Sequence, residues 1–256
     1  FIFQPAEEGY GGALHMLEDN ALKGVDEIYG IHLWNYQKFG TLGVCKGPIM
    51  AAADQFEIEI IGIGGHGATP QGTVDPIVVS AHLIQALQTI VSRNTNPLES
   101  TVVTVGQISG GSNFNIISNH VRLIGTARAY TEENRQMIIK RMREITQGIA
   151  TSFGATIHLN YMDGYPPTIN ATTPTNKLVS AAEKILPGNV GDPYRSMGGE
   201  DFSYFANEIP GCFFLVGSAP QDREPLSVPH HCSHFDIDER ALLVGASVFV
   251  QIIEDQ

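Results

Sequence analysis

The chain has 256 residues, of which 43% are hydrophobic and 16% charged, so a globular fold is expected and a disordered one is excluded. The formal net charge of −12, with no basic stripe, argues against nucleic acid as a partner. No apolar run is long enough to predict a membrane span, and three widely spaced cysteines favour a reducing, cytoplasmic compartment over a disulfide framework.

Residues 1–51 predict one α/β layer. Residues 1–3 look like the end of a buried strand, 13–20 are helical in pattern, and 25–33 predict a second strand. Strand, helix and strand in this order indicate α/β packing. The sequence begins without Met and inside a strand pattern, so we expect further residues of the same fold upstream. Residues 40–53 predict a connector.

Residues 52–163 have a different pattern. Apolar and acidic residues alternate over 55–63, as they do in a half-buried strand. Further strands are predicted at 101–108, 119–130 and 155–161, and helices at 76–93 and 132–152. The order βαββαβ predicts a ferredoxin-like unit, a four-stranded sheet with two helices on one face.

Residues 164–256 return to the first pattern. They predict helices at 176–186, 201–207 and 236–256, the last opened by a capping box of Asp236 and Glu239. An unbroken apolar run at 211–217 predicts a strand buried on both faces. The predicted fold class is therefore α/β, with an outer domain in two pieces, 1–51 and 164–256, around a domain inserted at 52–163.

Adjacent carboxylates, Glu7 and Glu8, follow the first predicted strand. One of them can ligate a cation while the other stays free as a general base. The alternative is a solvated first helical turn, where Glu is favoured in any case.

Histidines gather at two places in the outer domain. His32 ends the second predicted strand, where a satisfied core histidine is the alternative. Three histidines and a cysteine fall within residues 230–234, just before a helix, and such ligands suit zinc and related ions. His231 is the preferred ligand, with His230 and His234 as second choices and an exposed histidine-rich loop as the alternative.

The inserted segment offers further polar groups. His66 lies between glycines, which allow its ring a close approach to another surface. Asn115 and Arg128 form a natural pair for binding a carboxylate, although a turn-forming Asn and a surface Arg remain alternatives. In the segment 196–202, Gly199 and Glu200 are candidates for substrate contact, whereas Asp201 fits an ordinary helix N-cap.

Six segments of the sequence resemble, in order and over nearly the whole chain, one family of enzymes. The segments are residues 4–9, 30–34, 64–70 with the following Asp75-Pro76, 115–128, 197–202 and 231–239. They resemble the aminoacylase/carboxypeptidase-type metallo-amidohydrolases, in particular the hippurate hydrolases, auxin-conjugate hydrolases and N-acyl-L-amino acid amidohydrolases.

The resemblance implies a catalytic α/β domain with two divalent metal ions (Zn, Mn, Co or Ni) and an inserted lid that dimerises. Glu7 resembles the family's general base, and Glu8, His32 and His231 resemble its metal ligands. The implied reaction is hydrolysis of the amide bond of a small N-acyl amino acid.

The lid residues are also implied by the resemblance. His66 resembles the histidine that reaches a neighbouring subunit's site and stabilises the oxyanion. Asn115 and Arg128 are similar to the residues that hold the substrate carboxylate.

Two departures from the family pattern qualify these expectations. The family has an upstream Cys-Gly-His-Asp-type motif that supplies metal ligands, and no such motif occurs here, so we expect this chain alone to be inactive. Ser118 stands where the family usually has proline. A deacetylase of N-acetyl-diaminopimelate type, and a non-catalytic dimerising module or inactive fragment, are the alternative functions.

Overall fold

The computed structural model describes residues 1–9, 11–227 and 229–256, which form two compact units. Unit 1 comprises Phe1–Met50 and Pro167–Gln256, and unit 2 comprises Ala51–Pro166. Each unit has its own hydrophobic core. The predicted boundaries were 51/52 and 163/164.

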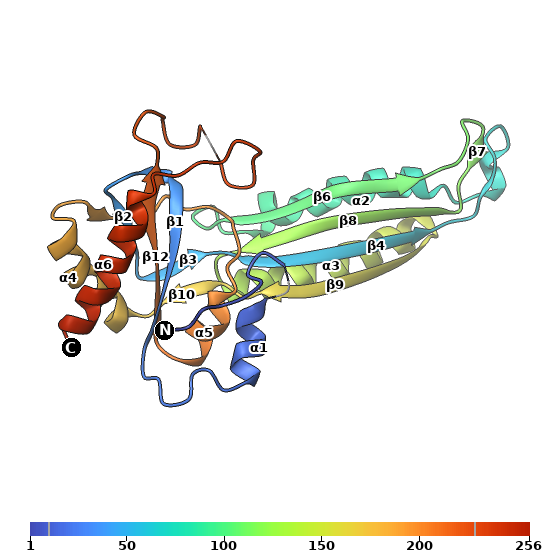
Figure 1. Cartoon of the computed structure of the whole chain (residues 1–256). Coiled ribbons are helices and arrows are strands. Elements are labelled where there is room, and N and C mark those ends of the chain that lie inside the picture. Colours follow the sequence, from blue (N-terminus) through green and yellow to red (C-terminus); the bar gives the residue numbers. More distant parts are fainter. Residues whose placement is uncertain (10, 228) are drawn as a thin grey trace. The chain divides into compact units, whose positions relative to one another are not determined.

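Unit 1 is built on a mixed sheet in which β12 (Gly211–Ala219) is an inner strand (Figure 1). The sheet order among the described strands is β1 (Ile28–Lys38), β12, β2 (Leu42–Gly43), β11 (Val190–Gly191). Strands β1 and β12 run parallel from the pair Ile28 and Gly211 to the pair Trp34 and Gly217. A separate antiparallel pair joins β3 (Gly47–Met50) to β10 (Thr168–Asn170).

Helices cover both faces of this sheet because alternate residues of β12 point to opposite sides. Phe214 and Val216 pack in a core with α4 (Thr172–Ile185) and α6 (Arg240–Glu254). Phe213 and Leu215 pack in a second core with α1 (Gly12–Glu18) and α5 (Phe202–Glu208). All nine residues of β12 are buried, which confirms the strand predicted from the apolar run.

Unit 2 has the predicted βαββαβ order. The antiparallel sheet runs β6 (Thr101–Gly110), β8 (His120–Ala129), β4 (Ala52–Ile61), β9 (Thr156–Tyr165). Its core joins sheet residues such as Phe56 and Ile58 to Leu83 and Leu87 of α2 (Pro76–Thr89) and to Ile138 of α3 (Glu132–Phe153). The two helices lie on one face of the sheet, as in a ferredoxin-like fold (Figure 1).

Short elements complete unit 2 around the sheet. A π-helical turn, η2 (Ile90–Asn94), extends α2, and a 3-10 turn, η1 (Pro70–Gly72), precedes it. The two-stranded pair of β5 (Gly65–His66) and β7 (Ile116–Ile117) lies beyond the end of β4 and β8 (Figure 1).

Some local predictions were wrong. Residues 1–3 form no strand in the structure, and Phe1 is 98% exposed. Helix α6 begins at Arg240, and its N-cap, Glu239, makes no side-chain capping bond. The Asp236 box does not form because Asp238 instead accepts hydrogen bonds from the Arg240 backbone and side chain. The expected connector at 40–53 holds the short strands β2 and β3.

Candidate functional site

A cavity of about 730 Å³ in unit 1 brings together several of the predicted site residues. Its polar lining includes Glu7, Glu8, His32 and Glu200, and its apolar lining comes from β1, α5, β12 and α6. His32 lies on β1, whereas Glu7 and Glu8 lie on the segment that leads into α1. The sequence thus places a carboxylate pair and a histidine, distant in sequence, around one cavity.

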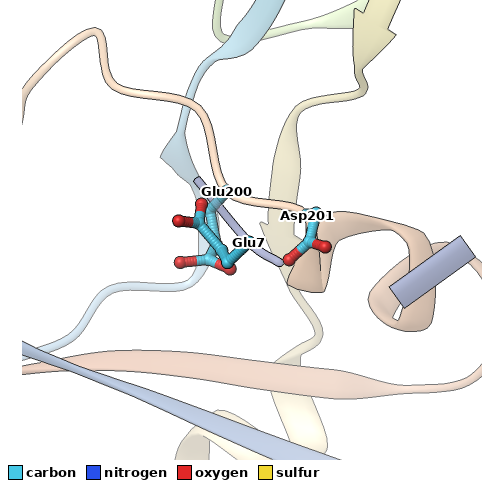
Figure 2. A group of neighbouring side chains, drawn as sticks. All are labelled: Glu7, Glu200 and Asp201. Atoms are coloured by element: carbon cyan, nitrogen blue, oxygen red, sulfur yellow. The ribbon is translucent and has the colours of Figure 1, made fainter. Parts of the chain in front are cut away.

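Three carboxylates form a tight group beside this cavity (Figure 2). Oxygen atoms of Glu7, Glu200 and Asp201 lie within 4.8 Å of one another. Burial and then the Glu7 carboxylate raise the pKa of Glu200 to about 8. The pKa of Glu7 is raised by burial, then by Asp201 and Glu8, while His231 lowers it.

His32 is oriented by the backbone. Its Nδ1 lies 2.7 Å from the Leu33 carbonyl oxygen, and because a carbonyl only accepts, Nδ1 carries the proton. The lone pair of Nε2 is therefore available to a ligand. Burial lowers the pKa of His32, which keeps the ring neutral.

In the histidine-rich segment 230–234, the residue that contacts His32 is His230, which was predicted from the sequence only as a second choice of metal ligand. The rings of His32 and His230 are 5.2 Å apart between centroids, and Trp34 and Tyr36 each lie 4.9 Å from His230. Burial, then His32 and His231, lower the pKa of His230 to about 4. His231 is exposed and has a left-handed backbone with φ 63°, and it acts electrostatically on Glu7 and His32.

The residues present fit a divalent cation. Nε2 of His230 is buried and has no hydrogen-bond partner within the described residues, so an imidazole nitrogen is left without a partner beside His32. The neighbouring carboxylates of Glu7, Glu200 and Asp201 are grouped closely enough for their oxygens to share one cation. Imidazole nitrogen and carboxylate oxygen are the ligand types that zinc, manganese, cobalt and nickel share.

Glu200 and Gly199 lie on the loop before α5. Glu200 is 5% exposed, and its Oε1 accepts a hydrogen bond from the Phe202 N–H at 3.1 Å. Glu200 therefore has a structural contact at the start of α5 that its sequence position did not reveal. The preceding Gly198 faces Met50, whose Cε would lie 3.1 Å from an added Cβ.

Unit 2 brings together two of its three predicted site residues. Gly67 N–H donates to the Asn115 carbonyl at 2.8 Å, so the segments carrying His66 and Asn115 lie side by side. The Ala68 N–H donates to His66 Nδ1 at 3.1 Å, which leaves the Nε2 of this exposed ring as the proton donor.

Arg128 lies at the other end of the four-stranded sheet of unit 2. It pairs in register with Ala53 at the start of β4, whereas His120 pairs with Ile61 at the end that leads to His66. His120 and Arg128 are thus about 27 Å apart along β8. Within the described residues no hydrogen bond or ion pair reaches the guanidinium of Arg128, and burial lowers its pKa against the influence of Asp54.

Comparison with known proteins identifies the family. The model of peptidase family M20/M25/M40 matches residues 1–255. The chain belongs to this family. Among its M20 relatives, an N-acetyl-L-cysteine deacetylase of Bacillus subtilis is 41% identical over 249 residues, which cover 97% of this chain and 58% of the relative.

Other M20 proteins give a similar result. IAA-amino acid hydrolase ILR1-like 4 of Arabidopsis thaliana is 35% identical over 257 residues, covering 96% of this chain and 57% of the relative. The crystal structure of Bacillus subtilis YXEP, described as a dinuclear metal binding peptidase, matches with a TM-score of 0.80 and 32% identity over 98% of this chain and 63% of that one. The chain therefore spans less than two thirds of these relatives.

One residue of this M20 chain was missed as a part of the site. Asp201 is 0% exposed, belongs to the carboxylate group in Figure 2, and makes no capping bond to α5. The sequence did contain a signal, because Asp201 directly follows the candidate Glu200. If such an acid is buried, it needs hydrogen-bond donors around it. Where those donors lie was not readable from the sequence.

Proposed function

We propose that the protein containing this chain hydrolyses the amide bond of N-acyl amino acids. The observation that carries the proposal is the group of three clustered carboxylates beside a cavity that a backbone-oriented histidine also lines. Relatives named as a deacetylase and an amino acid hydrolase support the class of substrate.

Two divalent cations complete the proposed site. Glu8, His32 and His231 would hold them. His230 lies close to His32, so it is a further candidate ligand that should be tested together with His231. When bound, the cations polarise the amide carbonyl and lower the pKa of the attacking water.

Proton transfer is assigned to Glu7. Its carboxylate lies at the same cavity as His32 and Glu200, and the metal ions are assigned to Glu8, His32 and His231 instead. It accepts the proton of the attacking water and delivers it to the leaving amine. Glu200 and Gly199 are proposed to contact the substrate at the same loop.

The lid residues are proposed to act across two copies of the chain. Arg128 and the pair of His66 and Asn115 are too far apart within unit 2 to hold one small substrate together. A second copy can supply His66, as donor to the oxyanion, and Asn115 to a site in which Arg128 holds the carboxylate.

The surface proposed to join the two copies lies on unit 2. The sequences of α2 and the edge strand β6 contain no Asp, Glu, Lys or Arg, although the chain has a net charge of −12. Apolar side chains are exposed there, including Ile77 at 45%, Val78 at 48% and Ile108 at 54%. A second copy meets no like charge on this surface, and an unpaired edge strand can bond to its equivalent.

The test uses the longest polypeptide that the gene encodes. We expect it to contain divalent metal by elemental analysis and to release amino acids from N-acetyl or N-benzoyl substrates. Glu7→Gln is expected to lower kcat on the order of 10²- to 10⁴-fold while leaving bound metal in place, because a general base contributes that much. Absence of both metal and turnover would favour a non-catalytic module.

A further inference from the structure

The segment that carries Glu7 and Glu8 is held at both ends by one distant side chain. Oδ1 of Asp201 accepts a hydrogen bond from Gln4 Nε2, and Oδ2 accepts one from the Ala13 N–H at 3.0 Å. Gln4 and Ala13 lie on either side of the two glutamates in the sequence. A single carboxylate therefore joins the two ends of the segment between Gln4 and Ala13, which is called the glutamate loop below.

At its second end, the described residues of this loop provide no side-chain cap for the helix that follows. Helix α1 begins at Gly12, and its N-cap, Gly11, has a left-handed backbone and no side chain that could accept a hydrogen bond. The Ala13 N–H is one of the unpaired donors of a first helical turn, so its acceptor must come from elsewhere. Asp201 supplies that acceptor from the start of α5.

The path between the two anchors is tight. A Cβ on Gly12 would lie 1.9 Å from the Pro5 carbonyl oxygen, so the chain folds back closely on itself. The Gly11 N–H donates to the Ala6 carbonyl at 3.2 Å, and Ala6 has φ 53°, a conformation that costs energy outside glycine. The described residues of this segment therefore fold back closely between the two points that Asp201 bonds.

Asp201 is not occupied by its own helix. Helix α5 receives no side-chain capping bond from it, and the Phe202 N–H bonds to Glu200 instead. Both oxygens of a fully buried carboxylate are therefore used for the glutamate loop.

We infer that Asp201 is a positioning residue that fixes the places of the Glu7 and Glu8 carboxylates by bonding Gln4 and Ala13 at once. The inference rests on the proposed hydrolysis, in which both glutamates act. A displacement of about 1 Å in a catalytic group costs on the order of 10²-fold in rate. Asp201→Asn is therefore expected to lower kcat roughly 10- to 100-fold. Its effect on KM is expected to be small, because Asp201 and Gln4 are not proposed to hold the substrate.

The experiment compares Asp201→Asn, Gln4→Ala and the double variant in the longest encoded polypeptide. The measurements are kcat and KM, zinc affinity by competition with a chelator, and amide hydrogen exchange of Ala13 in the metal-free protein. Asp201→Asn is expected to speed exchange at Ala13 and to weaken zinc binding through Glu8. The double variant is expected to lose more than Asp201→Asn alone, because the oxygen that Asn retains can still accept from Gln4 and Gln4→Ala removes that second contact.

Asn170→Ala is the matched control. Asn170 is 3% exposed in the same unit, and its amide group bonds to the Cys45 and Phe213 backbones, neither of which belongs to the glutamate loop. Its loss is expected to lower thermal stability but to leave kcat and zinc affinity of the folded protein unchanged.

Wild-type kcat, zinc affinity and Ala13 exchange in Asp201→Asn would overturn the inference. So would losses that merely follow thermal stability and are matched by Asn170→Ala. If the wild type hydrolyses no N-acyl amino acid, the proposed function fails, whereas Ala13 exchange and zinc affinity still decide whether Asp201 positions the loop.

Discussion

Asp54 places a carboxylate inside unit 2, where four donors meet it. Arg135 donates from Nε and Nη2 at 2.8 and 2.7 Å, and the Tyr161 hydroxyl and the Gly164 N–H each donate at 2.8 Å. Asp54 is 3% exposed and Arg135 8% exposed. One acid therefore joins β4, α3 and the end of β9, and its removal leaves a buried cation without its partner.

Asp54→Asn is expected to destabilise unit 2 by about 3–5 kcal/mol, the usual cost of breaking a buried ion pair on one side. Hydrogen exchange of the β4 amides in urea measures it. Asp163→Asn is the control, because Asp163 is 72% exposed and 3.5 Å from Arg135, and a surface pair of this kind contributes at most about 1 kcal/mol. Equal effects of the two variants would contradict the prediction.

Glu27 and Lys177 form an ion pair on the surface of unit 1, with Nζ 2.7 Å from Oε1. The hydrogen bond from Lys177 is the main cause that lowers the pKa of Glu27 below its ordinary value of 4.5. A lowered folded-state pKa means that the pair stabilises the fold above pH 4.5 and that this stability is lost as pH falls through the folded-state pKa.

Lys177→Met is therefore expected to reduce stability at pH 7 by less than about 1 kcal/mol, because the pair is partly exposed. The difference from the wild type should shrink as pH falls below 4.5. Urea unfolding at several pH values measures this difference, and a difference that grows towards acid would contradict the assignment.

Among the elements, β8 depends on a glycine at the centre of the unit 2 sheet. A Cβ on Gly125 would lie 2.2 Å from Cζ of Phe56 and 2.3 Å from the Thr104 carbonyl oxygen. The backbone of β6 cannot retreat from this position without breaking its pairing with β8. Gly125 thus sets how closely the two strands and the core aromatic ring approach.

Gly125→Ala is expected to lower the stability of unit 2 by about 3 kcal/mol, at the upper end of the cost of overpacking. Gly106→Ala in the neighbouring strand is the control, because a Cβ there meets nothing within 4 Å. Thermal unfolding of both variants gives the comparison, and a neutral Gly125→Ala would show that the sheet can spread.

Elements with a strong pattern were predictable, and those that depend on a partner were not. The apolar run of β12 and the alternation in β4 gave correct strands because burial on two faces or one leaves its own periodicity. Residues 1–3 are equally apolar but form no strand, because a strand also needs a neighbour to pair with. The start of α6 was misplaced because a local Asp238 contact replaced the expected cap.

For the whole molecule, the net charge of −12 opposes self-association except where charge is absent. The uncharged surface of α2 and β6 is such a place. None of the helices in the described residues has the length and apolar composition to cross a bilayer.

Ile108→Lys in β6 is expected to convert a dimer to a monomer, because it puts a charge on each of two facing strands. Sedimentation velocity measures the change. Thr156→Lys is the control, since it adds the same charge at an exposed residue of β9, the opposite edge of the sheet. A wild-type protein that is monomeric, or a dimer that survives Ile108→Lys, would contradict this surface.

The candidate site depends on contacts across the whole molecule, so it was only partly predictable from the sequence. Glu7, Glu8 and His32 were proposed because they stood at the ends of predicted strands, although residues 1–3 form no strand and β1 continues past His32 to Lys38. The bond between Gln4 and Asp201 joins residues 197 positions apart and leaves no local pattern. The separation of Arg128 from His66 also follows only from the register of β4 and β8.

The pairing of Met50 with Thr168 in β3 and β10 has a consequence for how this chain could have arisen. The residues that flank unit 2 are already neighbours within unit 1, so residues 51–166 occupy the position of a hairpin loop. A two-residue turn could close the same hairpin. Gain, loss or exchange of the whole insert by recombination would therefore leave the strands of unit 1 in register, and each unit could acquire substitutions with little effect on the folding of the other.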